Sequence, residues 1–144
     1  MIKTTLATLL ALFIISATAS AQTDSLKDTK PVFTKVDKEA KFPGGMQGWK
    51  TYLETNLNAN LAKHIKLKRK QKFAQQTVKV QFLVDKDGNV SNVKAVNNAE
   101  VHPKLAAEAE RVIKEGPKWE PAEQNGRRVL YQCIQYITWQ VEEE

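Results

Sequence analysis

The clearest pattern in the chain is an alternation of apolar and polar residues that begins near residue 77. Its apolar members are Val78, Val80, Phe82 and Val84, and this period of two predicts a strand with one face toward the core. Residues 85–88 (Asp-Lys-Asp-Gly) form a tight-turn signal. Apolar residues return at Val90, Val93, Ala95 and Val96. Two such runs joined by Asp-Gly predict an antiparallel hairpin.

Two other segments show the apolar spacing of a helix. The first follows the turn signal Phe-Pro-Gly-Gly at 42–45, and its apolar residues are Met46, Trp49, Leu53 and Leu57. Lys50 and Glu54 fall on the opposite, solvated side. The second helix starts at Pro103, stops at Gly116 and Pro117, and has apolar residues at Leu105, Ala109, Val112 and Ile113. Both apolar stripes are predicted to face the core.

A long strand is predicted at 128–140, after a turn at Asn125 and Gly126. One side carries Val129, Tyr131, Cys133, Ile137 and Trp139, and the other carries Leu130, Ile134 and Tyr136. The order of elements places two helices over one face of a small antiparallel sheet. We therefore predict an α+β fold of two layers.

The amino terminus is predicted to direct export. One lysine, an apolar run over 6–17 and the small residues Ala19-Ser20-Ala21 have the layout of a cleavable signal peptide. We therefore divide the chain into a signal at 1–21, a flexible leader at 22–31, a domain at 32–141 and an acidic tail at 142–144. The alternative is an inner-membrane anchor through residues 6–21, although a spanning helix needs about 20 apolar residues.

Positive charge is concentrated in one stretch. The chain has 22 Lys and Arg against 16 Asp and Glu, and six of the basic residues fall within 63–72: Lys63, Lys66, Lys68, Arg69, Lys70 and Lys72. One interpretation is a solvated loop. The other is contact with an anionic surface such as phospholipid or lipopolysaccharide head groups, where each basic residue contributes about 1 kcal/mol. Export argues against nucleic acid as the partner.

The sequence favours a binding protein over an enzyme. Cys133 is the single cysteine, so it cannot form an intramolecular disulfide, and its place within a strand indicates an inert buried thiol. His64 and His102 lack the spacing of metal ligands. Glu108 and Glu110 are interpreted as a solvated helix face. We predict no catalytic residue, no metal and no cofactor.

Five motifs follow one another along the chain. They are Phe-Pro-Gly-Gly at 42–45, the hairpin VKVQFLVDKDGNV at 78–90, His-Pro-Lys-Leu at 102–105, Gly-Pro-Lys-Trp-Glu-Pro-Ala at 116–122 and Gln-Asn-Gly-Arg-Arg-Val at 124–129. Together they resemble the TonB C-terminal domain family, in the stand-alone exported form of Bacteroidota energy-transducer-like proteins. The resemblance covers residues 32–141. It implies two helices on one face of a three-stranded antiparallel sheet, and a location in the periplasm.

The resemblance also implies a mode of binding. Domains of this family hold a short extended segment of an outer-membrane transporter, the TonB box, beside their final strand by strand addition. Carried onto this chain, the partner-binding residues are Trp119, Arg127, Arg128, Val129, Leu130, Tyr131, Gln132, Cys133, Ile134 and Gln135. Core packing is the first interpretation of Trp119 and Trp139. The implied role is TonB-dependent transport or its regulation, with transporters or other envelope proteins as partners.

Some features depart from a complete energy transducer. The apolar segment carries no ionisable group, and the nine-residue spacer at 22–30 has no proline and would reach at most about 32 Å. Family members usually have a Tyr-Pro pair and a Gly-rich segment before the hairpin, whereas this chain has residues 68–76 there. Tyr136 occupies a position where proline is common in the family. The alternative function is a structural envelope protein that self-associates as a homodimer through the last strand, or one that binds an anionic surface without a role in transport.

Overall fold

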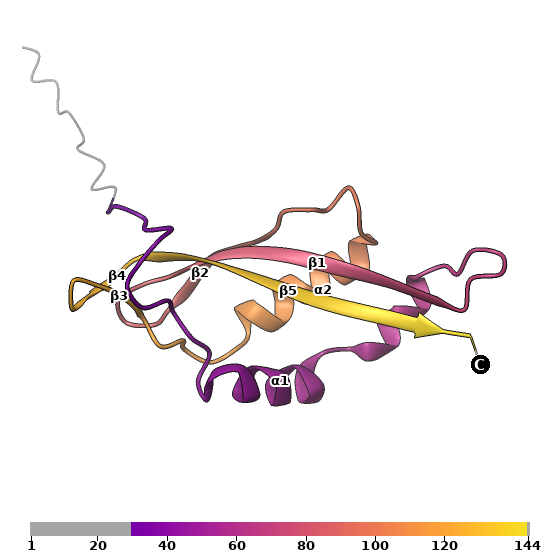
Figure 1. The fold of residues 1–144 in the computed structure, drawn as a ribbon, viewed down its shortest axis with the longest axis horizontal. Coiled ribbons are helices and arrows are strands. Elements are labelled where there is room, and N and C mark those ends of the chain that lie inside the picture. The colour runs from indigo at the N-terminus through magenta and orange to yellow at the C-terminus, as the bar shows by residue number, and fades with distance from the viewer. Residues whose placement is uncertain (1–29, 144) are drawn as a thin grey trace, which may run out of the picture.

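The computed structural model describes residues 30–143 (Figure 1). The predicted signal peptide, most of the predicted leader and Glu144 lie outside the described residues. The helices are α1 (Gly45–Asn56), the short 3-10 helix η1 (Ala59–His64) and α2 (Pro103–Lys114). The strands are β1 (Phe73–Val84), β2 (Val90–Ala95), β3 (Ala122–Gln124), β4 (Arg127–Val129) and β5 (Tyr131–Glu142). Within residues 30–143, no helix has the length and apolar character needed to cross a membrane.

Three long strands form the main sheet in the order β2-β1-β5, and both pairings are antiparallel. β1 and β5 are paired over their whole length, from Phe73 opposite Glu142 to Val84 opposite Tyr131. β1 is thus the central strand, and β5 is an edge strand. The predicted α+β class and the predicted β1-β2 hairpin are confirmed.

The turn of this hairpin depends on Asp85 and Gly88. Asp85 Oδ1 accepts hydrogen bonds from the backbone N–H groups of Asp87 and Asn89, at 2.8 and 2.9 Å. Gly88 has φ = 84° and its carbonyl accepts the N–H of Trp119 at 2.9 Å. A Cβ atom at position 88 would lie 2.2 Å from the carbonyl oxygen of Trp119. Only glycine fits here, because the left-handed φ and the close approach both exclude a side chain.

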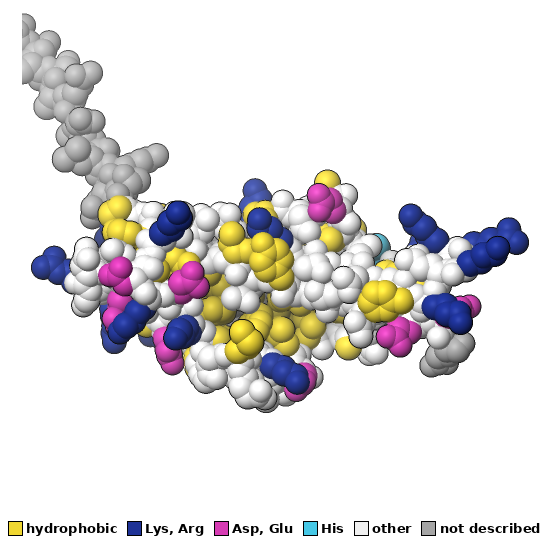
Figure 2. Space-filling model, viewed as in Figure 1, with side chains coloured by type: hydrophobic (Ala, Val, Ile, Leu, Met, Phe, Trp, Pro, Cys, Tyr) yellow, Lys and Arg dark blue, Asp and Glu magenta, His cyan; other side chains and the backbone are white. Residues whose placement is uncertain are grey.

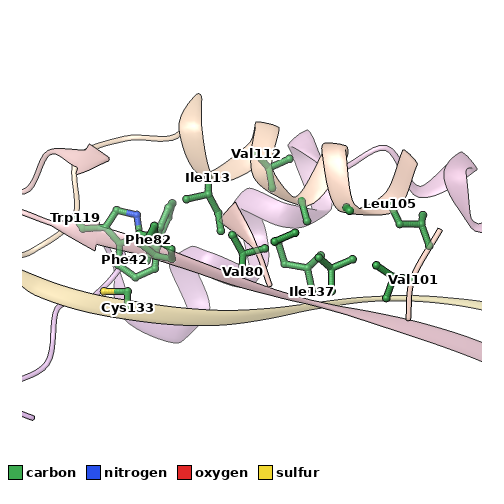
Figure 3. Packing of buried hydrophobic residues seen from close by; sticks show 14 of the residues in the cluster. Phe42, Val80, Phe82, Val101, Leu105, Val112, Ile113, Trp119, Cys133 and Ile137 are labelled. Carbon is green, nitrogen blue, oxygen red and sulfur yellow. The ribbon is translucent and has the colours of Figure 1, made fainter. Parts of the chain in front are cut away.

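The core lies between the sheet and α2 (Figure 3). All four apolar residues predicted to face inward from β1 are buried: Val78, Val80, Phe82 and Val84. α2 contributes five buried residues: Leu105, Ala106, Ala109, Val112 and Ile113. Pro103 is the first residue of α2, and His102 precedes it as the N-cap, where its side chain accepts the N–H of Lys104. The predicted second helix is confirmed in its start and in its buried face.

α1 lies along the β5 side of the sheet (Figure 1) and buries no residue completely. Trp49, Leu53 and Leu57 pack partly against the core, whereas Met46 is 87% exposed. The prediction that Met46 belongs to a core-facing stripe is therefore wrong. The helix begins beside Gly44 and Gly45, both with positive φ, and its first turn places Met46 beyond the edge of the core.

The predicted single strand over 128–140 is also wrong at its start. Asn125 and Gly126 adopt positive φ, so residues 127–129 fold back as β4 and pair with β3 in a separate two-stranded sheet. β5 begins only at Tyr131. The Asn-Gly pair favours a tight hairpin turn, and the first three residues after it pair within that hairpin and not with β1.

The segment 31–42 crosses this part of the molecule and is called the N-terminal strap below. It makes isolated bridges from Phe33 to Tyr131, from Lys38 to Glu123 and from Lys41 to Glu120. Asp37 also accepts the backbone N–H of Asn125 through Oδ2 at 2.7 Å. The strap therefore fastens the β3-β4 hairpin and the start of β5.

Candidate functional site

One side of β5 pairs with β1, and the opposite side, called here the outer edge, faces away from the sheet. Two hydrogen bonds identify which residues face outward. Gln132 donates its N–H to the Phe33 carbonyl, and the Leu130 carbonyl accepts the N–H of Phe33, both at 2.9 Å. Since the backbone groups of an antiparallel strand alternate between its two sides, the even-numbered residues of β5 face the outer edge.

The first part of the outer edge is already paired. Phe33 bridges to Tyr131 in the parallel direction and occupies the outward groups of Leu130 and Gln132. Beyond this point the strap turns away toward β3. The start of β5 is therefore protected within the chain itself.

The outer edge is open further along. By the same alternation, Ile134, Tyr136, Thr138 and Gln140 direct their backbone groups outward. Within residues 30–143, no hydrogen bond from another segment reaches these groups. The side chains of Ile134 and Tyr136 are 39% and 61% exposed. An edge with unpaired N–H and C=O groups is a template for another extended backbone.

Two hollows lie between α1 and β5. The first, called the aromatic hollow, has a volume of about 380 Å³ and is lined by Ala40, Lys41, Phe42, Gly45, Met46, Trp49, Trp119 and Gln135. The second, called the aliphatic hollow, has a volume of about 360 Å³ and is lined by Lys50, Leu53, Glu54, Leu57, Ala59, Tyr136, Ile137 and Thr138. Each hollow combines residues of α1 with residues of β5, so apolar surface flanks the open edge (Figure 2).

Three aromatic side chains in mutual contact line the aromatic hollow. Phe42, Trp49 and Trp119 have ring centroids 5.2 to 5.8 Å apart. Trp119 is 5% exposed and also makes an edge contact with Phe82 at 5.0 Å. Aromatic rings in these geometries stabilise each other beyond simple burial. Trp119 is therefore a core residue that also contributes to the wall of the hollow, and Trp139, at 3% exposed, is a core residue.

Charges around the hollows are few and solvated. Lys50 and Glu54 form an exposed i,i+4 pair at 3.8 Å, and such pairs contribute little. Lys41 lines the aromatic hollow. The recognition chemistry at this edge is thus backbone pairing and apolar contact, with lysines at the rim.

Polar contacts hold α1 and η1 in place beside β5. Arg111 of α2 donates to the carbonyl of Asn56 at 2.8 Å and forms an ion pair with Glu108 at 2.7 Å. Glu108 accepts the N–H of Asn58, and Trp139 donates its indole N–H to the Asn58 carbonyl. The hydrogen bond from Arg111 holds the pKa of Glu108 below its usual value, against the effect of burial.

The expectation of a solvated Glu108 and Glu110 face is therefore wrong. The Glu108 side chain is only 10% exposed and serves the contact between α2 and η1. Glu110 accepts the N–H of Ala95 at 2.9 Å and pairs with Lys114 at 3.1 Å. Both carboxylates have structural partners, because α2 lies close to β2 and to η1.

The remaining reactive side chains are enclosed. Burial, assisted by the Glu39 carboxylate, raises the pKa of Cys133 to about 12, so its thiol stays protonated at neutral pH and is a poor nucleophile. Burial likewise raises the pKa of Tyr131 to about 12. Among the described residues, no group of three or more His, Cys, Asp or Glu side chains is placed to hold a metal ion.

His64 and His102 stack on each other with ring centroids 4.6 Å apart and an interplanar angle of 12°. Nε2 of His64 is buried without a hydrogen-bond partner among residues 30–143. Burial lowers the pKa of His64, and the nearby charges of Lys104, His102 and Lys63 lower it further. The pair joins the end of η1 to the N-terminus of α2.

The structure divides residues 127–135, all predicted to bind a partner, into four groups. Arg127, Arg128 and Val129 lie in β4, and Arg128 also lines a separate hollow of about 300 Å³ beside Phe33 and Asp85. Leu130 and Gln132 are paired with the strap. Tyr131 and Cys133 point into the core. Ile134 and Gln135 lie at the start of the open edge.

The sequence reasoning missed the second half of the open edge and the contribution of α1. Tyr136, Thr138 and Gln140 extend the edge, and Met46, Trp49 and Leu53 line the hollows beside it. The alternation along β5 predicts that Tyr136 and Thr138 face away from the core. The strap covers the start of β5 and so leaves these later residues as the open part of the edge. No local sequence pattern predicts this pairing of the strap.

The six basic residues at 63–72 lie at the opposite end of the molecule from the β3-β4 hairpin, in and beside the loop between η1 and β1 (Figures 1 and 2). All six are exposed. They are remote from both hollows, whose lining residues include none of them.

Comparison with known families gives a match. Residues 68–141 match the model of the family described as the Gram-negative bacterial TonB protein C-terminal. The matched range begins in the basic loop, ends one residue before the end of β5, and leaves α1 and the strap outside it. No curated protein and no solved structure matches the chain.

Proposed function

Because this chain belongs to the TonB C-terminal family, as its motifs indicated, we propose that it binds extended segments of outer-membrane transporters, or of other envelope proteins, along the outer edge of β5. The family is a periplasmic protein-interaction domain without enzymatic activity, and its members interact in general with TonB-dependent transporters. The proposal concerns where such a segment lies on this chain and which groups hold it. Its role is TonB-dependent transport or the regulation of that transport.

The open edge is the observation that supports the proposal. Four successive outward positions of β5, from Ile134 to Gln140, have no partner among residues 30–143. The strap shows that the same edge accepts an extended backbone, since Phe33 pairs with Leu130 and Gln132. A partner segment needs only to continue this pairing along the strand.

The hollows supply contacts for side chains of the added segment. Alternate side chains of a strand point to one side, and those pointing toward α1 meet the aromatic hollow near Gln135 and the aliphatic hollow near Ile137. The two hollows are thus spaced along β5 by two residues, which is the repeat of a strand. Backbone pairing provides affinity, and the hollows select apolar side chains.

Along β5, the proposed site therefore overlaps the residues inferred from the family only at Ile134 and Gln135, and Trp119 also belongs to it as a lining residue of the aromatic hollow. Binding over 127–133 would require the strap and the β3-β4 hairpin to release their hydrogen bonds. Binding over 134–140 requires no such release. We place the site at the open part of the edge for this reason.

The variant Tyr136→Pro tests the backbone pairing. Tyr136 faces the outer edge, so proline removes an outward N–H and leaves the hydrogen bonds to β1 in place. Tyr136→Ala is the matched control, because it removes the same side chain and keeps the N–H. We expect Tyr136→Pro to weaken binding about tenfold relative to Tyr136→Ala, the value of one lost hydrogen bond at an interface.

The measurement is a titration of isotope-labelled protein with N-terminal peptides of outer-membrane transporters, followed by amide chemical shifts. Changes in amide chemical shift on residues 134–140 and on the α1 residues that line the hollows would support the proposal. Equal affinities for the two variants, or shifts confined to β2 and the far face of α2, would contradict the proposal. Shifts over 134–140 that depend on protein concentration without peptide would indicate self-pairing and also contradict it.

A further inference from the structure

The end of η1 and the loop between η1 and β1 form a positively charged tip, defined here by Lys63, Lys66, Lys68, Arg69, Lys70 and Lys72. All six side chains are exposed, and none forms an ion pair with an acidic residue within 30–143. Figure 2 shows Lys and Arg gathered at this end of the molecule. The open edge of β5 does not use these residues, so they have no role in the proposed strand addition.

The tip has a defined shape. Ile65 is 6% exposed and anchors the start of the loop in the core. The Gln71 N–H bonds to the Lys68 carbonyl at 2.9 Å, and the Gln71 side chain accepts the N–H of Lys68 at 3.1 Å. Lys70, the third residue of this turn, has φ = 69°, a value that type II turns have at this position. The turn holds Arg69 and Lys70 at its apex, and both are exposed.

Apolar side chains accompany these charges. Phe73, directly after the basic stretch, is 41% exposed, and Leu67 within the loop is half-buried. Acidic residues lie beside the tip at the end of β5, where Glu142 pairs with Phe73 and Glu143 donates its N–H to the Lys72 carbonyl at 3.0 Å. Six basic residues against the two described C-terminal glutamates, Glu142 and Glu143, leave the tip positive.

We propose that this tip binds the surface of an anionic phospholipid bilayer. The tip projects from one end of the domain (Figure 1), and none of its residues lines either hollow beside β5. A projecting group of lysines beside an exposed aromatic ring fits a flat surface of phosphate groups with an apolar interior. Lysines near such a surface each contribute to binding through its negative potential.

This contact would orient the domain in a useful way. β5 runs along the long axis and ends beside the tip, while the strap and the β3-β4 hairpin lie at the other end (Figure 1). A domain attached through its tip would direct β5 away from the bilayer. The open edge would then remain accessible to extended segments of envelope proteins, and the two contacts would not compete.

The test compares two variants with the same change in charge. The first replaces Lys68, Arg69 and Lys70 by glutamine at the tip. The control replaces three exposed basic residues at the other end, Lys35→Gln, Lys86→Gln and Arg128→Gln. The same net charge is left in both, so a difference between them reports the position of the charge and not its amount.

Binding is measured by co-sedimentation with vesicles of equal parts phosphatidylglycerol and phosphatidylcholine, and with pure phosphatidylcholine vesicles. The wild-type protein and both variants are collected after export and share the same N-terminus. We expect the tip variant to bind the anionic vesicles roughly 100-fold more weakly than the wild type, from about fivefold per basic residue. The control variant should bind within a fewfold of the wild type.

Salt provides a second readout. Binding should fall steeply between about 0.1 M and about 1 M salt, as the screening length falls from about 10 Å to about 3 Å. Equal losses in the two variants, wild-type binding to pure phosphatidylcholine as strong as to the mixture, or no binding to either vesicle would overturn the proposal. These vesicle results do not affect the peptide titration that tests the edge of β5, so the two proposals can fail separately.

Discussion

α1 and α2 have the same length, twelve residues, and both carry an apolar stripe in the sequence, yet they take different places in the molecule. α2 buries five residues against the sheet, and α1 buries none completely. α2 lies across the inner face of β1 and contacts β2, so its stripe completes the core. α1 lies at the side of the sheet where, among residues 30–143, β5 pairs only with the strap at its start.

The two helices are also held in place by different forces. The α2 stripe consists of Leu, Val, Ile and Ala side chains that fit closely over the strands. α1 is held by aromatic contacts, such as Trp49 and Tyr52 on Phe42 at 5.2 and 5.1 Å, and by polar contacts to α2. The Tyr52 hydroxyl donates to the Val112 carbonyl at 2.7 Å, and Arg111 donates to the Asn56 carbonyl.

The difference separates scaffold from binding surface. Folding buries the apolar surface of α2, whereas part of the apolar surface of α1 stays exposed beside the open edge of β5. Residues that stabilise the domain and residues that would contact a partner are therefore on different helices. The three experiments below test this separation.

The largest effect is expected from Leu105→Ala in α2. Leu105 is fully buried, so its truncation should lower the free energy of unfolding by about 2–5 kcal/mol, through lost burial and the cavity left behind. Leu53→Ala in α1 is the matched change and should cost at most about 1 kcal/mol, because Leu53 is only partly buried. Denaturant unfolding measures both. Similar losses for the two variants would show that α1 is as much a part of the core as α2.

A smaller effect is expected at the contact between the helices. Tyr52→Phe removes the hydroxyl that donates to the Val112 carbonyl and should lower the free energy of unfolding by about 1 kcal/mol. Burial raises the pKa of Tyr52, so this hydroxyl keeps its proton at neutral pH. Thr55→Val is the control, since it removes an exposed hydroxyl bond within α1 and should change stability by less than about 0.5 kcal/mol. A negligible effect of Tyr52→Phe would mean that this bond does not hold α1 on α2.

The smallest effect concerns the stacked histidines between η1 and α2. Burial and nearby positive charges lower the pKa of His64, so protonation is less favourable in the folded than in the unfolded chain. The stability that neutral His64 contributes to the folded state is fully present above the ordinary histidine pKa of about 6.5. It is lost as the pH falls through the lowered pKa that His64 has in the folded chain. We expect the melting temperature to decrease between about pH 7.5 and about pH 5.5.

The variant His64→Gln isolates this group, because it removes the titrating ring from the pair. Its melting temperature should change less with pH over the same interval than that of the wild type. Identical pH dependences in the two proteins would assign the effect to other groups. Glu108, with its lowered pKa, loses its contribution only at lower pH, outside this interval.

Local patterns predicted much of the scaffold. The alternation over Val78–Val84, the Asp-Gly turn and the spacing of Leu105, Ala109 and Val112 each correspond to an element of the structure. These predictions succeed because each pattern reports burial on one face of one element. The same reasoning gave a wrong prediction for Met46. Helical spacing shows which residues share a face, and it does not show how far the core extends beneath that face.

The candidate site was predicted only in outline. The family resemblance indicated the last strand, and the open part of that strand proved to be 134–140 because Phe33 pairs with Leu130 and Gln132. That pairing joins residues about a hundred positions apart in the chain. The β3-β4 hairpin likewise removes Arg127 and Arg128 from β5.

The amino-acid sequence by itself determined the elements of the scaffold, the family and the position of the basic stretch, since these depend on residue type and spacing along the chain. Tertiary structure alone decided which part of β5 has free backbone groups and which helix keeps apolar surface exposed. Both depend on which distant segments come into contact, and the free energy of such contacts is set by packing and hydrogen bonding between elements, which no local pattern records.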